Sequence, residues 1–544
     1  MSIRFLALAA AGVAIAVLYT ALSPGFDPTG MIYVDMARHM AAGDGIAGSI
    51  YFPSHVPKNP SPIALWPPLY PAAIAGVSLL GIDLRIAARL ISVGAFGMSV
   101  GLVGVLGTAL FGEAVGLIAA FLVMSWPPIV EIAGMALSEN LFVFFVLLAV
   151  LASVRLIAVP EAVRPYRLAA TGGLAMAAAT LTRYPGLTLT AVAGAALLLN
   201  LRGRAWVDRL TLTAVWSSAA LGPPVLLLAR NRFVTGTFMG TGRPADDSGL
   251  AYHVVYAVKT IGTDALSLIG RLAVMPEVLG FGTGVMALVV LVAGALMLFG
   301  LIRSAGARDA LLAALAVPVA TPAARFTMVI GFGYWAAMAA VRSVTAFEPL
   351  NTRMMMPTYP LVLLGAVAII ASCLERIGMS RRVLAWTLGG LAAAAVAVIV
   401  LPQSLAAGGP RLRPDPAPAW VVWIAAHTPP GAPIVGNRSA EVNFYLGRPT
   451  YSFQARAVFR AGNRFDRDCP VIARHLAALG WKPAYLVLHA EEGGFDAELM
   501  GRRYGPTIER LLKGDLALPV RPVARQPEFA AFEILDLAWK CDGH

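Results

Sequence analysis

Few side chains in this sequence are suited to chemistry, and they are charged groups that stand beside long apolar stretches. The polar segment 24–85 carries Asp27 and Asp35, as well as Lys58 and His55. A carboxylate can take the proton of an attacking hydroxyl or amine, and nearby cations can stabilise negative charge on a departing phosphate. Charge beside hydrocarbon is costly, so its placement is the best indication of function.

Arginines stand at the ends of several apolar segments that are far apart in the chain. A guanidinium group is planar, stays charged and donates two parallel hydrogen bonds, which suits phosphate recognition. Together they would suit an anionic lipid headgroup or a phosphorylated substrate, whereas singly each would pair with a carboxylate or reach to water. The expected path through the membrane brings eight arginines to one membrane face: Arg38, Arg85, Arg89, Arg183, Arg230, Arg232, Arg243 and Arg353.

Each carboxylate also has a structural interpretation. Ser138 or Glu139 suits the start of a helix, where a capping oxygen and negative charge are favourable. Asp35 suits the polar face of a helix over 31–42, and Asp27, which precedes a proline, suits a turn or a helix cap. At this stage the structural and the catalytic interpretations both stand.

The composition predicts a polytopic α-helical membrane protein. Of the 544 residues, 58% are hydrophobic and 13% are charged. Apolar runs of about 20 residues recur up to residue 402, and each is long enough to cross a bilayer as a helix. The net charge of +12 is explained by arginines in short loops between helices, which favours a topology signal over nucleic-acid binding.

The excess of arginine on the cytoplasmic side of membrane proteins gives the expected path. Arg4 begins a retained first helix, because Pro24 makes a poor site for signal-peptide cleavage. The segment 66–82 is placed along the outer surface, since a crossing there would turn Arg155 outward. About 11 spans are expected, over 4–23, 86–110, 114–135, 138–156, 168–182, 186–200, 210–229, 281–302, 326–345, 355–374 and 383–402. An amphipathic helix is expected over 250–274 in an outer loop, and an interfacial helix or a shallow hairpin is expected over 309–324.

The domain organisation follows from a change in composition after Pro402. Residues 1–402 form the expected membrane module, with 24–85 as its first outer loop, and 403–418 form a linker rich in Pro, Gly and Ala. Residues 419–544 are expected to form an outer α/β domain. Its elements are strands over 432–436 and 484–488 and helices over 471–479 and 506–512. Cys469 and Cys541 in that domain are either a disulfide or two separate thiols.

Other catalytic patterns find little support. The sequence has no HExxH, CxxC, Walker A or GxSxG element in a usable context. His39 and His55 suit polar anchors better than metal ligands. Trp66, Tyr70 and Trp126 fit an interfacial aromatic belt, although an aromatic ring in an outer cavity also stacks on sugars.

Five stretches taken in order resemble the GT-C membrane glycosyltransferases, in particular the branch with protein O-mannosyltransferases and the lipid A aminoarabinose transferase. They cover roughly residues 1–375, and each motif alone is weak. They are the acidic first-loop segment with Tyr33-x-x-Met36-Ala37-Arg38, Pro67-Pro68-Leu69-Tyr70-Pro71, Ala87-Ala88-Arg89-Leu90, Leu137-Ser138-Glu139-Asn140-Leu141 followed by Leu181-Thr182-Arg183-Tyr184-Pro185, and Asn351-Thr352-Arg353-Met354.

The resemblance implies transfer of a sugar from a polyprenyl-phosphate donor outside the inner membrane, with inversion at the anomeric carbon. A first-loop aspartate would be the base, and Glu139 the second acidic residue. The family's aspartate lies about four residues before the tyrosine, where this chain has Thr29, so Asp27 and Asp35 are rival candidates. The remaining implied substrate-binding residues are Lys58, Tyr33, Arg89, Arg183, Arg353, Tyr70 and His55.

The expected partners are the polyprenyl-phosphate sugar, a lipid, glycan or protein acceptor, and membrane lipids. Polyprenyl phosphate is a good leaving group, and carboxylates are sparse here, so we expect no cofactor and favour no divalent metal. The protein is expected in the plasma membrane, with the active site and the C-terminal domain on the periplasmic side. The alternatives are a transporter or flippase of a polyprenyl-linked sugar and a ligase of the O-antigen type.

Overall fold

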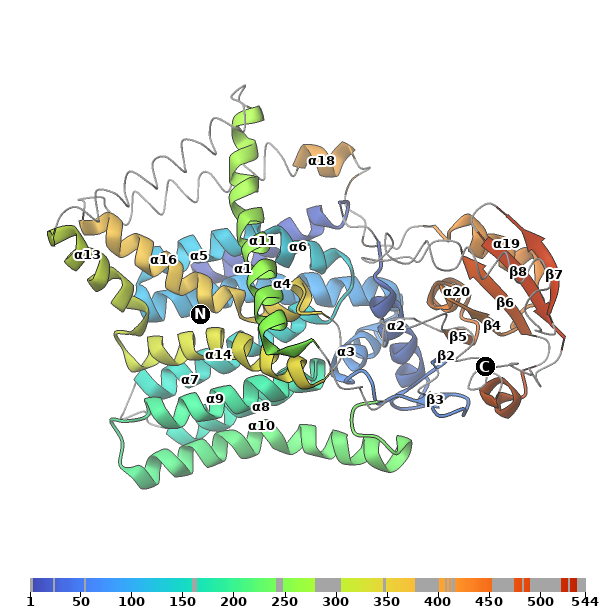
Figure 1. Cartoon of the computed structure of the whole chain (residues 1–544), viewed down its shortest axis with the longest axis horizontal. Helices are drawn as coiled ribbons and strands as arrows, with labels where there is room; N and C mark the ends of the chain where they lie inside the picture. The colour runs from blue at the N-terminus through green and yellow to red at the C-terminus, as the bar shows by residue number, and fades with distance from the viewer. Residues whose placement is uncertain are drawn as a thin grey trace. The chain divides into compact units, whose positions relative to one another are not determined.

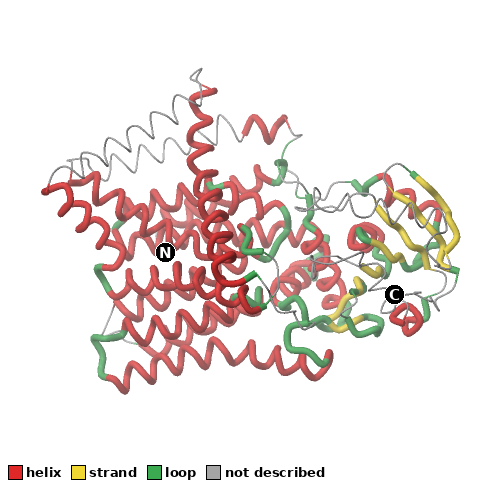
Figure 2. Tube along the Cα trace, viewed as in Figure 1, coloured by secondary structure: helices red, strands yellow, loops and turns green. Residues whose placement is uncertain are grey.

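The structure is a computed structural model, and most of what it describes is helical (Figures 1 and 2). The described residues are 3–22, 25–52, 55–158, 164–240, 248–278, 305–345, 349–376, 401–406, 409, 412, 416–452, 474–481, 484–489, 520–526 and 529–535. The chain divides into two compact units. The first unit consists of Met1–Pro24, Arg89–Leu226 and Pro244–Leu412, and the second of Gly25–Ala88, Leu227–Arg243 and Arg413–His544.

The first unit is a bundle of apolar helices. Its described elements are α1 (Ile3–Tyr19), most of α4 (Leu84–Phe111), α5 (Glu113–Ser125), α6 (Pro127–Gly134), α7 (Glu139–Ala158), α8 (Pro165–Thr182), α9 (Gly186–Asn200), most of α10 (Trp206–Thr235), α11 (Gly249–Val278), α13 (Ala305–Ala316), η1 (Val317–Val319), α14 (Pro322–Val344), α15 (Thr352–Met355), η2 (Met356–Thr358), α16 (Tyr359–Arg376) and α18 (Leu401–Ala406). Most agree with the expected helices to within a few residues.

Among the described residues, five helices are long and apolar enough to cross a membrane. They are Leu84–Phe111, Glu139–Ala158, Trp206–Thr235, Pro322–Val344 and Thr352–Arg376. The apolar stretches Phe5–Tyr19, Leu69–Ser78, Glu113–Ser125 and Gly186–Asn200 form shorter helices. The expected total of about 11 spans therefore stays a prediction.

Small residues let several helices of this bundle approach closely. A Cβ on Gly97 of α4 would lie 2.4 Å from Val13 Cγ2 and 2.6 Å from the carbonyl oxygen of Ala9 on α1. A Cβ on Gly173 of α8 would lie 2.2 Å from the carbonyl oxygen of Trp216 on α10. Packing of this kind is typical of membrane helices, where lipid removes the hydrophobic drive for association.

The span expected over 114–135 is wrong as a single helix. The structure has two helices there, α5 and α6, with Trp126 between them at φ −82° and ψ 109°. Trp126 precedes two prolines, and the residue before a proline avoids helical backbone angles. The indole thereby leaves the regular helical path, and its Nε1 donates to the carbonyl oxygen of Asp264 at 2.8 Å.

The second unit is built on a six-stranded mixed sheet in the order β2-β5-β4-β6-β8-β7. The pairs β2–β5, β5–β4 and β4–β6 are parallel, and β6–β8 and β8–β7 are antiparallel. The strands are β2 (Ile50–Tyr51), β4 (Ile434–Gly436), β5 (Thr450–Ser452), β6 (Ala484–His489), β7 (Val520–Arg525) and β8 (Phe529–Ile534). Helices α19 (Ala419–His427) and α20 (Ser439–Leu446) belong to the same unit.

The first loop supplies an edge strand to this sheet. Ile50 pairs with Thr450 and Tyr51 with Tyr451, so the loop and the C-terminal residues share one fold. The loop also holds α2 (Pro28–Ala41), α3 (Leu69–Ser78) and a short hairpin of β1 (Ala47–Gly48) and β3 (Ser61–Pro62).

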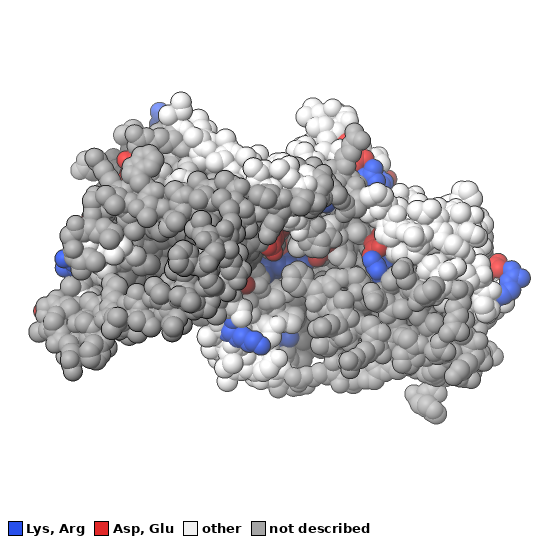
Figure 3. Space-filling view, turned by 90° about the horizontal axis from the view of Figure 1, so that it is seen from above, with Lys and Arg blue, Asp and Glu red and all other residues white. Residues whose placement is uncertain are grey.

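Several expected features lie outside the described residues. They are the helices over 281–302 and 506–512, residues 383–400 of the helix expected over 383–402, and Arg243, Cys469 and Cys541. On the face drawn in Figure 3, charged residues form a few small groups, and in several of them basic and acidic residues lie side by side.

Candidate active site

A buried carboxylate with two arginines forms a polar cluster in the first unit. Glu139 is fully buried at the start of α7. Its Oε1 lies 2.7 Å from Arg183 Nη1 and accepts a hydrogen bond of 2.5 Å from Arg353 Nε. Two guanidinium groups around one carboxylate leave an excess of positive charge, and a buried excess of this kind favours an anionic ligand.

The backbone on either side of Glu139 is arranged for this contact. Ala136, in the turn between α6 and α7, has a φ of 55°, a conformation that costs a residue with a Cβ about 1–2 kcal/mol. Strained positions of this kind concentrate at functional sites. Arg183 lies at the C-terminal end of α8 with an extended backbone, and its Nη1 donates to Ser138 Oγ at 3.4 Å. Two helix ends therefore present their side chains to each other.

The short helix α15 carries Arg353 and is held from several sides. Asn351 caps it by accepting from the N–H of Met354. The Tyr334 hydroxyl donates to the carbonyl oxygen of Met354 at 2.8 Å, and Trp335 Nε1 donates to that of Met355 at 3.0 Å. Both donors come from α14. A four-residue helix has little stability of its own, so these contacts fix its place.

Asp264 of α11 binds the residues on both sides of Arg353. Its Oδ1 accepts from the Thr352 hydroxyl at 2.9 Å, and its Oδ2 accepts from the Tyr359 hydroxyl at 2.5 Å. The Tyr359 ring stacks on Trp126 with an interplanar angle of 14°. The sequence analysis did not single out Asp264. Its only signal was an acidic residue in an amphipathic helix.

Arg89 is buried in α4, and its Nε donates to the carbonyl oxygen of Gly134 at 3.1 Å. One turn later, Ser92 donates to the carbonyl oxygen of Leu137 at 3.2 Å. The same Ser92 oxygen lies 3.4 Å from Asn140 Nδ2. This face of α4 therefore binds the backbone that leads into Glu139.

In the second unit, Asp27 is the N-cap of α2. Its backbone is extended, and its Oδ1 accepts from the N–H of Thr29 at 2.7 Å. Pro28 follows at the first helical position, which suits its fixed φ. Asp27 is half-buried.

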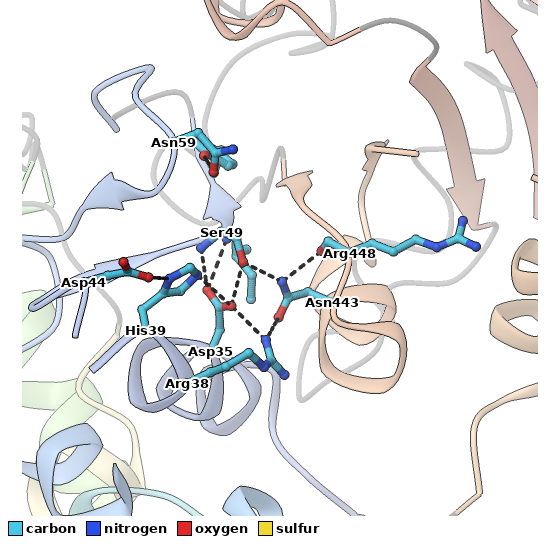
Figure 4. A network of polar contacts seen from close by, with 10 residues as sticks. Asp35, Arg38, His39, Asp44, Ser49, Asn59, Asn443 and Arg448 are labelled. Carbon is cyan, nitrogen blue, oxygen red and sulfur yellow. Dashed lines mark hydrogen bonds and ion pairs between the residues drawn. The ribbon is translucent and has the colours of Figure 1, made fainter. Parts of the chain in front are cut away.

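Asp35 is fully buried and is surrounded by donors (Figure 4). Its Oδ2 accepts from the N–H of Ser49 at 2.7 Å and from that of Ile50 at 3.3 Å. Its Oδ1 accepts from the Ser49 hydroxyl at 2.8 Å and from Arg38 Nη1 at 3.0 Å. Ionised, this carboxylate has both oxygens engaged by protein donors.

Of the other predicted site residues, Tyr33 and Tyr70 are buried and meet edge to face, with ring centroids 5.2 Å apart. The Tyr70 hydroxyl donates to the carbonyl oxygen of Ala88 at 2.9 Å. Lys58 is exposed. Their role in substrate binding stays a prediction.

His55 is buried beside Phe52 and Trp66, with ring centroids 5.0 Å and 6.2 Å away. Neither ring nitrogen has a hydrogen-bond partner within the described part of the chain. Burial, and after it the charge of His475, lowers the pKa of His55 to about 4. The ring is therefore neutral at physiological pH.

The arginines expected on the outer membrane face make different kinds of contact. Arg38 and Arg85 pair with carboxylates close by in sequence, at 3.0 Å from Asp35 and from Asp83. Arg230 donates to the carbonyl oxygens of Ile63 and Ile46 at 2.9 Å, and Arg232 donates to that of Gly236 at 2.6 Å. Only Arg183 and Arg353, among the described members of this set, share one carboxylate oxygen. No group of three His, Cys, Asp or Glu suited to a metal occurs in the described ranges.

Comparison with known proteins gives the fold. No protein-family model matches the chain, and no curated protein matches it in sequence. It is similar to the crystal structure of ArnT from Cupriavidus metallidurans bound to undecaprenyl phosphate, with a TM-score of 0.56 and 15% identity over 98% of this chain and 99% of that one. ArnT from the same organism in the apo state gives 0.55 and 17% over 99% and 98%.

A third similar structure is the archaeal oligosaccharyltransferase AglB from Archaeoglobus fulgidus, in complex with an inhibitory peptide and a dolichol-phosphate. Its TM-score is 0.56 and its identity 12%, over 99% of this chain and 75% of that one. ArnT and AglB are GT-C superfamily enzymes, so this chain has the GT-C fold. The resemblance drawn from the sequence motifs is confirmed at the level of the fold.

Proposed function

We propose that this protein is a membrane glycosyltransferase that moves a sugar from a polyprenyl phosphate to a periplasmic or lipid-borne acceptor, with inversion. The observation that carries the proposal is the buried Glu139 with Arg183 and Arg353, a cluster with excess positive charge in a chain of GT-C fold. The similar ArnT structure is bound to undecaprenyl phosphate and the AglB structure to a dolichol-phosphate. An isoprenoid phosphate is thus the ligand class that suits this cluster.

In this proposal Arg183 and Arg353 bind the donor phosphate, and Arg89 supports the backbone beside them. Glu139 holds both guanidinium groups in place before the donor arrives. Because these cations are already oriented, they stabilise the charge of the departing phosphate with little reorganisation. Glu139 therefore acts as an electrostatic organiser of the cations.

Asp27 is the base that we assign. Asp35 is the rival, but its two oxygens accept four hydrogen bonds from Ser49, Ile50 and Arg38. Asp35 is also fully buried, so an acceptor has no free carboxylate oxygen to meet there. Asp27 caps a helix and is half-buried, which leaves it suited to proton exchange.

The reaction then proceeds in one displacement. The acceptor oxygen or nitrogen attacks the anomeric carbon from the face opposite the phosphate, and its proton passes to Asp27. The bond between the anomeric carbon and the phosphate oxygen breaks, and polyprenyl phosphate leaves with the electron pair. The arginines stabilise that charge, so this mechanism requires neither a general acid nor a divalent metal.

The finer features of this proposal complete the scheme. About 11 spans would place the first loop and the C-terminal α/β domain on the periplasmic side of the plasma membrane. Lys58, Tyr33, Tyr70 and His55 would shape the pocket for donor or acceptor. Aromatic rings close to His55 suit a sugar ring.

The first experiment identifies the sugar. Mass spectrometry of envelope glycans and glycolipids from a deletion strain should show the loss of one sugar substituent and the accumulation of its polyprenyl-phosphate donor. An unchanged envelope would contradict the proposal. Donor that moves between leaflets with no new glycosidic bond would favour a flippase instead.

The second experiment assigns the two roles in purified protein, with the accumulated lipid as donor. Asp27→Asn should lower kcat by about 10²–10⁴-fold, the usual contribution of general base catalysis, while donor binding is retained. Arg353→Ala should weaken donor binding by about tenfold or more, because a charged hydrogen bond is lost. Wild-type turnover by Asp27→Asn would overturn the assignment of the base.

A further inference from the structure

Helix α20, in the C-terminal part of the chain, makes contacts near both ends of α2. Two adjacent residues make these contacts, Asn443 and Phe444, and both are buried. Helix α20 connects β4 to β5, and β5 pairs with β2 of the first loop, so its place is fixed by the sheet.

At the N-terminal end of α2, the Phe444 ring packs on Phe26, with centroids 4.8 Å apart. Phe26 immediately precedes the capping residue Asp27. The Arg85 guanidinium lies 5.9 Å from the centre of the Phe444 ring. The backbone that enters α2 at Asp27 is therefore held by an aromatic side chain from the far end of the chain.

At the other end of α2, Asn443 completes the hydrogen bonds around Asp35 (Figure 4). Its Oδ1 accepts from Arg38 Nη1 at 3.2 Å, and its Nδ2 donates to Ser49 Oγ at 3.0 Å. The same Nδ2 donates to the carbonyl oxygen of Arg448 at 2.9 Å, just after α20. One amide thus binds the helix, the loop after it and its own turn.

We propose that α20 is the positioning element for the catalytic base, with Phe444 and Asn443 as positioning residues and Asp35 as their buried anchor. The inference rests on the proposed function, in which Asp27 takes the proton. Proton transfer requires a heavy-atom distance of about 2.6–3.2 Å. Two contacts, one on each end of α2, fix both the position and the direction of that helix.

The test compares Phe444→Leu with Phe529→Leu. Both rings are buried in the same unit, but Phe529 lies on β8 and meets Trp423 instead of α2. Full-length proteins are assayed with the lipid-linked sugar from the deletion strain as donor, and with undecaprenyl phosphate as the binding probe. Phe444→Leu should lower kcat about tenfold to a hundredfold, as expected for a misplacement of about 1 Å, with no change in the affinity for undecaprenyl phosphate. Phe529→Leu should leave kcat unchanged.

Two further variants separate position from folding. Phe26→Leu changes the half-buried partner of the same contact. If Phe444→Leu melts at a lower temperature than Phe529→Leu, the kcat of Phe26→Leu replaces that of Phe444→Leu in the comparison. Asn443→Ala should also lower kcat and leave probe affinity unchanged. Equal kcat values for Phe444→Leu, Phe26→Leu and Phe529→Leu, with Asp27→Asn inactive, would overturn the inference and leave the proposed function standing. An active Asp27→Asn would overturn both.

Discussion

At the scale of single residues, two fully buried carboxylates have contrasting partners. Asp35 is held by backbone N–H groups, a hydroxyl and one arginine, whereas Glu139 is held by two arginines. Removing one partner from a buried ion pair typically costs about 3–5 kcal/mol, since the other charge stays buried. On the proposed function, both carboxylates act through the groups that they orient, and the half-buried Asp27 is the base that takes the proton.

His55 gives a pH prediction at the same scale. Its pKa is lowered from 6.5 to about 4 in the folded protein by burial, and by the charge of His475. At pH values above 6.5, His55 is neutral in both folded and unfolded chains and contributes no pH dependence. As the pH falls from 6.5 towards 4, the unfolded chain binds the proton first, so stability is lost by about 1.4 kcal/mol per pH unit at most.

The measurement is the melting temperature of the purified protein in detergent between pH 7.5 and 4. The wild type should lose more stability over this range than His55→Gln, whose side chain does not titrate. His427→Gln is the control, because His427 is exposed, and its curve should follow the wild type. Parallel curves for wild type and His55→Gln would contradict a buried neutral histidine.

At the scale of elements, α11 locks the short helix that carries Arg353. Asp264 binds hydroxyl groups before and after that arginine, and α14 binds two carbonyl oxygens of the same turn. The sequence predicted α11 as a helix over 250–274 but did not predict the short helix α15, and it gave no sign of their contact. Side-chain contacts between distant helices depend on tertiary packing, which a pattern along one helix does not report.

We expect Asp264→Asn to raise the donor KM about threefold to tenfold, because a hydrogen bond to a charged group contributes about 1.5–3 kcal/mol and part of it is retained by the amide. The effect on kcat at saturating donor should be smaller. Thr263→Ala, on an exposed site of the same helix, is the matched control and should match the wild type. A fall in kcat with unchanged KM would show that Asp264 does not act through the donor site.

At the scale of the whole chain, the sheet of the second unit constrains membrane topology. Strand β2 comes from residues 50–51 and its partner β5 from residues 450–452, so both lie on one side of the bilayer. The number of crossings between them must be even. The expected path has ten spans between these strands and satisfies this condition, whereas an added crossing by α3 would violate it. Helix α3 is also only ten residues long.

Cysteine labelling tests this parity. In a cysteine-free background, Ala42→Cys in the first loop and Ala426→Cys at the end of α19 are both exposed. A membrane-impermeant maleimide applied to spheroplasts should label both or neither, and by the expected path both. Labelling of one site alone would show that the two strands cannot share a sheet.

The sequence predicted most of the described helices, because a long apolar run indicates a helix whatever that helix packs against. It also selected Glu139, Arg183 and Arg353, because charge beside hydrocarbon is rare enough to stand out. It treated the first loop and residues 419–544 as separate bodies. The bond between Arg38 and Asn443 joins residues 405 positions apart, and no local pattern reports such a pairing.

The inserted edge strand has a consequence for biogenesis. A ribosome releases the chain from its N-terminus, so β2 emerges roughly 400 residues before the strand that pairs with it. During that interval β2 has no partner strand, so the sheet of the second unit is incomplete. On the proposed function, the base reaches its final position only when translation is nearly finished, so truncated products would not transfer the sugar.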